Sequence, residues 1–343
     1  MGTDNIKEIC PDHLENKFFK AYDRYSAHLT ALKNARIDLN NVDLNEFIPP
    51  NVISDYCSVV SKICHWAISK HDRPDNFSTL SEISDVIADI EKTPVKINWA
   101  SYKKIAHINI NRKLFPRIRA KSKHVRYDMF KTSTGRLSTK KDSFPILTLN
   151  KDFRIVVEPH NDLLIEMDYN AAEIRTLMYL MGLEQPKYDI HDYMMKNVFD
   201  SRATRESSKR RLFSWLYDSN KVDERLDKFF PRKEILDKFF DGKKIITPMN
   251  RQIMCDEYHA LNYLIQSSSS DMVLHQVAKI SDILKNRKSR VYFTMHDSFV
   301  IDFCNKDKDL IPKLFKTFSN TPFGEYRVNI SMGNNFSEMR KIS

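Results

Sequence analysis

The stretch LLIEMDYNAAEIRTLMYLMG, residues 163–182, decides the interpretation of the fold. Its first half is an apolar run of strand length that ends at Asp168. Its second half has apolar residues at helical spacing before Gly182, a helix stop. The pattern predicts a strand-to-helix junction at Asp168, with Glu173 one helical turn further on. Two interpretations stay open for this junction alone: Asp168 caps the helix N-terminus, as aspartate does well, or its carboxylate faces a cleft.

A second acid lies in a comparable setting later in the chain. The segment RVYFTMHDSFVIDF, residues 290–303, predicts two strands with His296 and Asp297 at or near the turn between them. Two carboxylates side by side repel each other, and divalent cations relieve that repulsion. Because magnesium prefers few carboxylates together with phosphate oxygens, Asp168 and Asp297 indicate phosphoryl transfer on a nucleotide.

A helix between the two acids carries a stripe of cations and aromatic rings. Arg205, Lys209, Phe213 and Tyr217 follow one another at steps of four residues, so they share one broad face. Two cations suit a triphosphate, and two aromatic rings suit a sugar and a base. The alternative is a basic amphipathic helix whose aromatic rings face the core. His191 lies near the start of another amphipathic helix, predicted over residues 188–199.

Composition limits the class of protein. The 343 residues exceed what one hydrophobic core usually organises, so we expect two or more lobes around a cleft. No apolar run is long enough to cross a bilayer, and the first residues lack a signal-peptide core, so we expect a cytoplasmic protein without membrane contact. The five scattered cysteines support neither a disulfide framework nor a zinc site. The six dispersed glycines exclude a glycine-rich phosphate loop.

The charge distribution points to a polyanionic partner. The net charge is +10, and residues 92–127 contain no acid but many lysines and arginines, interleaved with aromatic residues. Such a stretch fits a track for a nucleic-acid backbone, although a solvated charged face is the alternative. The expected DNA-binding residues of this stretch are Lys103, Lys104, Arg112, Lys113, Arg117 and Arg119.

Local composition and periodicity predict the remaining helices and strands. Residues 1 to about 90 are predicted to be helical, and strands are predicted around residues 145–149 and 153–158. The run QSSSSD, residues 266–271, has the composition of a linker, but apolar residues at helical spacing follow it at once. We therefore expect its serines and aspartate to begin a helix.

Six motifs in order resemble family A DNA polymerases, the bacterial polymerase I type. DYNAAEIR at 168–175 resembles the family's first catalytic motif, and His296-Asp297 resembles its second. The stripe from Arg205 to Tyr217 is similar to the nucleotide-binding helix of the family's fingers. Further matches are TSTGRLST at 132–139, DIH at 189–191 and N-x3-Q-x4-D beginning at Asn262. Together they cover roughly residues 125–303.

The resemblance implies an α+β fold of the right-hand type, with an antiparallel-sheet palm, helical fingers and a helical thumb. It divides the chain into a thumb region with the basic stretch at 1–125, a first palm part at 126–185, trimmed fingers at 186–262 and a second palm part at 263–343. It also implies two Mg²⁺ ions on Asp168 and Asp297, with Mn²⁺ able to substitute, and Lys209 as a proton donor to pyrophosphate.

The remaining roles follow from the same resemblance. Arg205, Lys209 and His191 would bind the phosphates of a deoxynucleoside triphosphate. Phe213 would pack on its sugar, Tyr217 would close the pocket, and Glu173 would exclude a 2′-hydroxyl. The residues implied to contact the primer–template DNA are Arg136, Gln266 and His296.

Ser298 departs from the family pattern. It replaces the family's usual acid, as in single-subunit RNA polymerases, whereas Glu173 and Phe213 argue against an RNA polymerase. We therefore expect a DNA polymerase without a proofreading domain. An RNA polymerase or primase-like enzyme and a catalytically silent primer–template-binding protein are the alternatives. Such a bare core suggests a phage or other mobile replicon, hence the host cytoplasm, with unknown replisome proteins as further partners.

Overall fold

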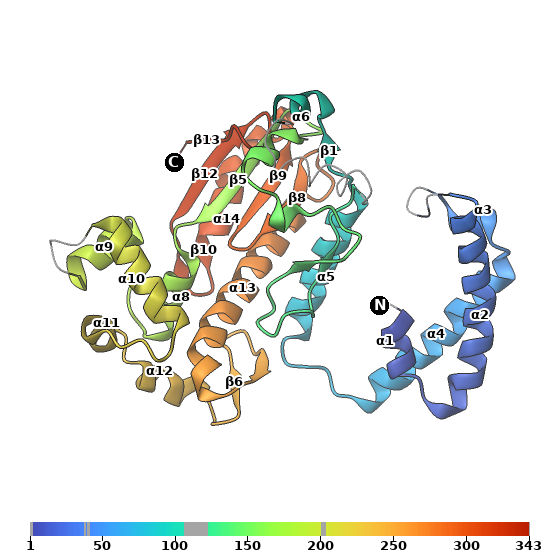
Figure 1. Cartoon of the computed structure of the whole chain (residues 1–343), viewed down its shortest axis with the longest axis horizontal. Coiled ribbons are helices and arrows are strands. Elements are labelled where there is room, and N and C mark those ends of the chain that lie inside the picture. Colours follow the sequence, from blue (N-terminus) through green and yellow to red (C-terminus); the bar gives the residue numbers. More distant parts are fainter. Residues whose placement is uncertain (1–2, 38, 40–41, 106–122, 200–203, 343) are drawn as a thin grey trace. The chain divides into compact units, whose positions relative to one another are not determined.

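The computed structural model describes residues 3–37, 39, 42–105, 123–199 and 204–342. The chain divides into two compact units, Met1–Pro74 and Asp75–Ser343 (Figure 1). The described residues of the first unit form one hydrophobic core cluster, and those of the second form two. The second unit contains all the described residues that the sequence singled out for a site.

The first unit is helical. Its helices are α1 (Thr3–Glu8), α2 (Asp12–Asn34), α3 (Leu44–Phe47) and α4 (Pro50–Lys70). Helices α2 and α4 pack together around Phe18 and Ile63, which are fully buried. Pro50 occupies the first turn of α4, where the missing N–H of proline costs no hydrogen bond. The helical prediction for the start of the chain is confirmed for the described residues.

The second unit is built on an antiparallel sheet. Its strands, as far as the structure describes them, follow the order β13 (Arg340–Lys341), β12 (Val328–Gly333), β5 (Leu163–Tyr169), β9 (Ser298–Phe303) and β8 (Arg290–Met295) (Figure 1). The central strand β5 is the first part of the stretch 163–182, from which the strand-to-helix junction was predicted. Alternate residues of β5 point to opposite faces, so Asp168 is on one face while Met167 and Tyr169 are buried on the other. The predicted strand pair at residues 290–303 is confirmed.

Helices and short strand pairs make up the rest of this unit, as far as the structure describes it. The described helices are α5 (Phe77–Lys92), α6 (Trp99–Ile105), α8 (Ala172–Leu180), α9 (Ile190–Asn197), α10 (Arg205–Tyr217), α11 (Glu224–Phe229), α12 (Arg232–Phe239), α13 (Glu257–Leu284) and α14 (Ile311–Ser319). The described short strands pair as β1 (Lys96–Ile97) with β4 (Val157–Glu158), β2 (Tyr127–Asp128) with β3 (Ser138–Thr139), β6 (Lys244–Ile246) with β7 (Gln252–Met254), and β10 (Asn320–Thr321) with β11 (Gly324–Glu325). Among the described residues, no helix has the length and apolar character needed to span a membrane.

Helix α13 connects two hydrophobic cores within this unit. Its first part, including Leu264 and Ile265, packs into a cluster formed mainly by α8 to α12. Its second part, from Met272 onward, packs into the cluster around the sheet, where α13 also contacts α5 and α14. The stacked rings of Tyr169 and Phe318, 4.0 Å apart, join β5 to α14 in the same cluster.

Two local predictions were wrong. The strands expected around residues 145–149 and 153–158 are mostly 3₁₀ helices, Ile146–Thr148 and Asp152–Val156, followed only by the short β4. Pro145 cannot donate a ladder hydrogen bond, and the Asn150 side chain accepts the amide of Phe153 at 2.8 Å, so both segments favour turns.

The serine run does not begin a helix. Helix α13 starts at Glu257, where Asp256 caps it by accepting the amide of His259 at 2.9 Å. Ser267–Ser270 lie in its buried middle, between the two cores. Their small size suits close packing there, and this overrides the linker-like composition.

The described contacts separate only residues 1–74 from the rest. Helix α5 and residues up to Ile105 pack into the cluster around the sheet. The family resemblance had predicted that they belong to the thumb region. The division into thumb, palm and fingers stays a prediction.

Candidate active site

The two predicted acids lie at the same end of the sheet. Asp168 is the next-to-last residue of β5, where it pairs with Ser298 at the start of β9. Asp297 precedes Ser298 in the turn after β8, and its carbonyl accepts the amide of Tyr169 at 3.4 Å. Helix α8 begins after Ala171, which has no side-chain cap. The interpretation of Asp168 as a helix cap is therefore wrong.

The two carboxylates influence each other electrostatically. Burial and the charge of Asp297 raise the pKa of Asp168 to about 7, while the Asn329 amide, donating at 3.4 Å, opposes the rise. Burial raises the pKa of Asp297 as well, opposed by nearby cations that include Arg136 and Lys209. Neither carboxylate forms an ion pair with another residue that the structure describes. A cation held between them would relieve this cost.

Sequence reasoning missed a third acid, Glu166. It lies two residues before Asp168 and so on the same face of β5. The Ser298 hydroxyl donates to Glu166 at 3.3 Å, and burial raises the pKa of the Glu166 carboxyl. The alternation of the strand was the available signal. Even so, no group of three or more His, Cys, Asp or Glu side chains in the described part of the chain is arranged to hold a metal ion.

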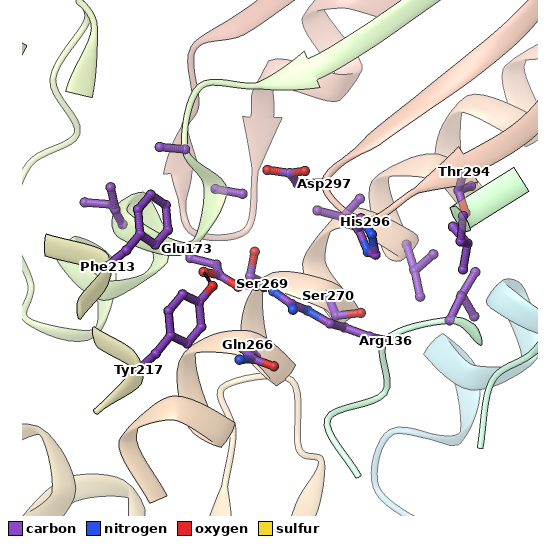
Figure 2. Close-up of a pocket in the computed structure, with 17 residues that line it drawn as sticks. Arg136, Glu173, Phe213, Tyr217, Gln266, Ser269, Ser270, Thr294, His296 and Asp297 are labelled. Carbon is purple, nitrogen blue, oxygen red and sulfur yellow. Dashed lines mark hydrogen bonds and ion pairs between the residues drawn. The ribbon is translucent and has the colours of Figure 1, made fainter. Parts of the chain in front are cut away.

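A cleft of about 260 Å³ opens beside Asp297. Its walls come from the turn before β3, from α8, α10 and α13, and from the end of β8 (Figure 2). Of the residues predicted for the site, the lining includes Arg136, Glu173, Phe213, Tyr217, Gln266, His296 and Asp297. Ser269 and Ser270 also line it, and they were not predicted as site residues.

Glu173 is the centre of a hydrogen-bonded group in this cleft. The Arg136 guanidinium pairs with one oxygen of Glu173, and the Tyr217 hydroxyl donates to the other. Figure 2 shows Glu173 between these two side chains. Burial and the Glu173 charge raise the pKa of Tyr217, so its hydroxyl stays a donor. The Phe213 ring stacks on Tyr217 with centroids 5.8 Å apart, which makes one aromatic wall.

The predicted phosphate-binding residues gather around α9 and α10, outside the cleft lining. Lys209 lies 5.8 Å from the centroid of Phe213, and Arg205 pairs with Asp189 at 3.1 Å. Asp189 also caps α9 by accepting the amide of His191 at 2.9 Å. Burial lowers the pKa of His191; the charge of Asp189 opposes this, and the charges of Arg205 and Lys209 lower it further.

The other predicted DNA-binding residues have mixed positions. Lys103 is exposed in α6, and Lys104 is in the same helix. The other residues predicted for this stretch lie outside the described residues, namely Arg112, Lys113, Arg117 and Arg119. On α13, Gln266 faces the cleft, whereas the next motif residue, Asp271, is buried against Arg251.

The fold is the one found in polymerase domains of the DNA polymerase I type. No protein-family model and no curated protein matches the sequence. A solved structure titled "POL domain of Pol1 from M. smegmatis complex with DNA primer-template and dNTP" is similar, with a TM-score of 0.66 at 13% sequence identity. The match covers 84% of this chain and 76% of that one.

Proposed function

We propose that the chain is a template-directed DNA polymerase that adds deoxynucleotides to the 3′ end of a primer. The pair Asp168 and Asp297 carries the proposal, because Asp168 pairs in the sheet with the residue that follows Asp297, and Asp297 lines a cleft walled by aromatic rings and an arginine. The fold shared with a DNA polymerase domain supports it independently.

The two carboxylates suit a hard divalent cation. Carboxylate oxygens are the protein ligands that Mg²⁺ prefers, and the pKa of Asp168 is raised first by burial and then by the nearby charge of Asp297. Asp168 and Asp297 would hold Mg²⁺, or Mn²⁺ in its place, and the two ions would supply the charge that activates a primer hydroxyl and stabilises leaving pyrophosphate.

The cationic side chains of α10 would bind the triphosphate. Lys209 is near enough to Asp297 to influence its pKa, so it would lie beside the reacting phosphates and donate a proton to pyrophosphate. Arg205 is more than half exposed and accessible to the outer phosphates. His191, whose pKa burial lowers, would act as a neutral hydrogen-bond donor.

The cleft walls would select the sugar and hold the primer end. Phe213 and Tyr217 would pack on the sugar and the base pair, and Glu173 would occupy the space of a 2′-hydroxyl. Arg136 and Gln266 would contact the minor groove at the primer end, where correct pairs present similar acceptors whatever the sequence.

Primer extension tests the proposal. The wild type should extend a DNA primer on a DNA template with deoxynucleotides only when Mg²⁺ or Mn²⁺ is present, and it should not shorten the primer. Asp168→Ala and Asp297→Ala should each abolish extension. Asp237→Ala, which removes an exposed acid of α12, is the matched control and should leave extension unchanged. Full activity in either active-site variant would refute the proposal.

Ser298 favours one alternative, an enzyme that polymerises ribonucleotides or starts without a primer. The same assay with ribonucleotides decides between them, since a strong deoxynucleotide preference that Glu173→Ala relaxes would exclude it. Salt-sensitive binding of primer–template without turnover in any metal would instead indicate a silent binding protein.

A further inference from the structure

Arg251 does not line the cleft, but it contacts the turn that carries Arg136. Gly135, the residue before Arg136, has a φ of +73°, and a Cβ atom on it would lie 2.6 Å from Cζ of Arg251. That distance leaves no room for a side chain, so the guanidinium packs directly on the backbone of the turn. The backbone angle favours glycine here, and any larger residue would have to displace the Arg251 guanidinium.

A buried ion pair fixes Arg251 in turn. Its Nε and Nη2 donate to the two oxygens of Asp271 at 2.8 and 2.7 Å. The side chain of Asp271 is 2% exposed and that of Arg251 is 14% exposed. A two-point pair fixes the plane of the guanidinium as well as its position. Because buried ion pairs are weak grounds for net stability, the geometry points to orientation as the purpose of this one.

The backbone on both sides of Arg136 is also held. The Ser270 hydroxyl of α13 donates to the carbonyl of Gly135 at 3.3 Å. The Thr132 hydroxyl donates to the carbonyl of Arg136 at 2.7 Å. With Arg251 against Gly135, these bonds leave Arg136 little freedom except in its side chain, which reaches Glu173 in the cleft.

We infer that Arg251 is a positioning residue for Arg136, an inference that rests on the proposed function. Together with Asp271, Arg251 fixes the turn at residues 132–136 so that Arg136 meets the primer end at a set position. Its contribution is therefore to the discrimination between matched and mismatched primer ends, which depends on where the Arg136 guanidinium lies.

A double-mutant cycle tests this inference. Extension from matched and mismatched primer ends is measured for Arg251→Lys, Arg136→Ala and the double variant. Lysine keeps the charge of Arg251 but lacks the planar fork, so the matched-to-mismatched ratio should fall about tenfold. Arg136→Ala should lower the ratio at least as much, and the double variant should equal Arg136→Ala alone. Losses that multiply in the double variant, or an unchanged ratio in Arg251→Lys, would overturn the inference.

Lys244→Ala provides the control, because Lys244 lies in β6 of the β6–β7 pair that also carries Arg251. The Lys244 ammonium donates to Gln252 at 2.9 Å and has no described contact with the turn at residues 132–136. The matched-to-mismatched ratio of this variant should therefore equal that of the wild type. If circular dichroism shows that Arg251→Lys is unfolded, a second measurement replaces it. Hydrogen exchange at the Gly135 amide is then compared between the wild type and Asp271→Asn. This amide donates to Thr132 at 3.2 Å and should exchange at least about tenfold faster in the variant, whereas equal rates would overturn the inference. A wild type that never extends a primer overturns the proposed function itself, while multiplying losses in an active enzyme overturn only the role of Arg251.

Discussion

Replacing Asp168 with asparagine should stabilise the metal-free protein at neutral and higher pH. Burial and the neighbouring Asp297 raise the pKa of Asp168 from 3.8 to about 7. At about 1.4 kcal/mol per pKa unit, ionising this carboxyl costs the folded state at most about 4 kcal/mol. The folded state binds the proton more tightly than the unfolded state. The cost is therefore full above about pH 7, shrinks as the pH falls, and is absent below about pH 4.

Urea unfolding in the presence of a chelator measures this cost. At about pH 8, the free energy of unfolding of Asp168→Asn should exceed that of the wild type by about 1–4 kcal/mol, and at about pH 4 the two should be equal. Added Mg²⁺ should stabilise the wild type more than the variant, since a cation bound only to the folded state stabilises it.

Asp302→Asn is the matched control on the same sheet. Asp302 is fully buried in β9 but pairs with Arg290 at 2.8 Å and accepts the amide of Asn161 at 2.8 Å. Its replacement should destabilise the protein at about pH 8, opposite in sign to Asp168→Asn, because it removes the charge of a buried acid whose oxygens accept from Arg290 and Asn161. If Asp168→Asn is no more stable than the wild type at this pH without metal, the electrostatic account of the acid pair is wrong.

Three further predictions concern the cleft and α10. Glu173→Ala should reduce the preference for deoxynucleotides over ribonucleotides by about 10- to 100-fold, measured as the ratio of the two kcat/KM values, because the space of the 2′-hydroxyl opens. Tyr217→Phe keeps the stacked ring but removes the hydroxyl that donates to Glu173, so it should reduce the same preference about tenfold while thermal unfolding stays near that of the wild type. Lys209→Gln should lower kcat/KM for deoxynucleotides by about 10²- to 10³-fold, with primer–template affinity within about twofold of the wild type; a parallel loss of DNA affinity would contradict the assignment of Lys209 to the triphosphate.

The sequence predicted correctly those elements whose structure depends on residues close together in the chain. The strand and helix around Asp168, the hairpin around Asp297 and the helix from Arg205 to Tyr217 all have strong local periodicity, and the structure contains each of them. Antiparallel pairing of two such strands is enough to bring their acids together. The catalytic and binding roles of these residues remain proposals that the assays above address.

The missed features depend on partners that are distant in the chain. Arg251 gains its importance only from Asp271 and Gly135, and no local pattern connects these three. Glu166 needed the register of β5 against β9 to be connected with Ser298. The serine run was misplaced because burial inside α13 follows from the packing of two cores on either side, which composition alone does not reveal.

Helix α13 has a consequence for how the second unit unfolds. Its 28 residues form one continuous helix, so the core around the sheet and the core beside the cleft have a single rod in common. If either core unfolds, one half of this helix loses its packing contacts. A helix in a protein gains most of its stability from such contacts. The described residues of the second unit should therefore lose structure in one cooperative transition, with hydrogen-exchange protection lost together in both halves of α13.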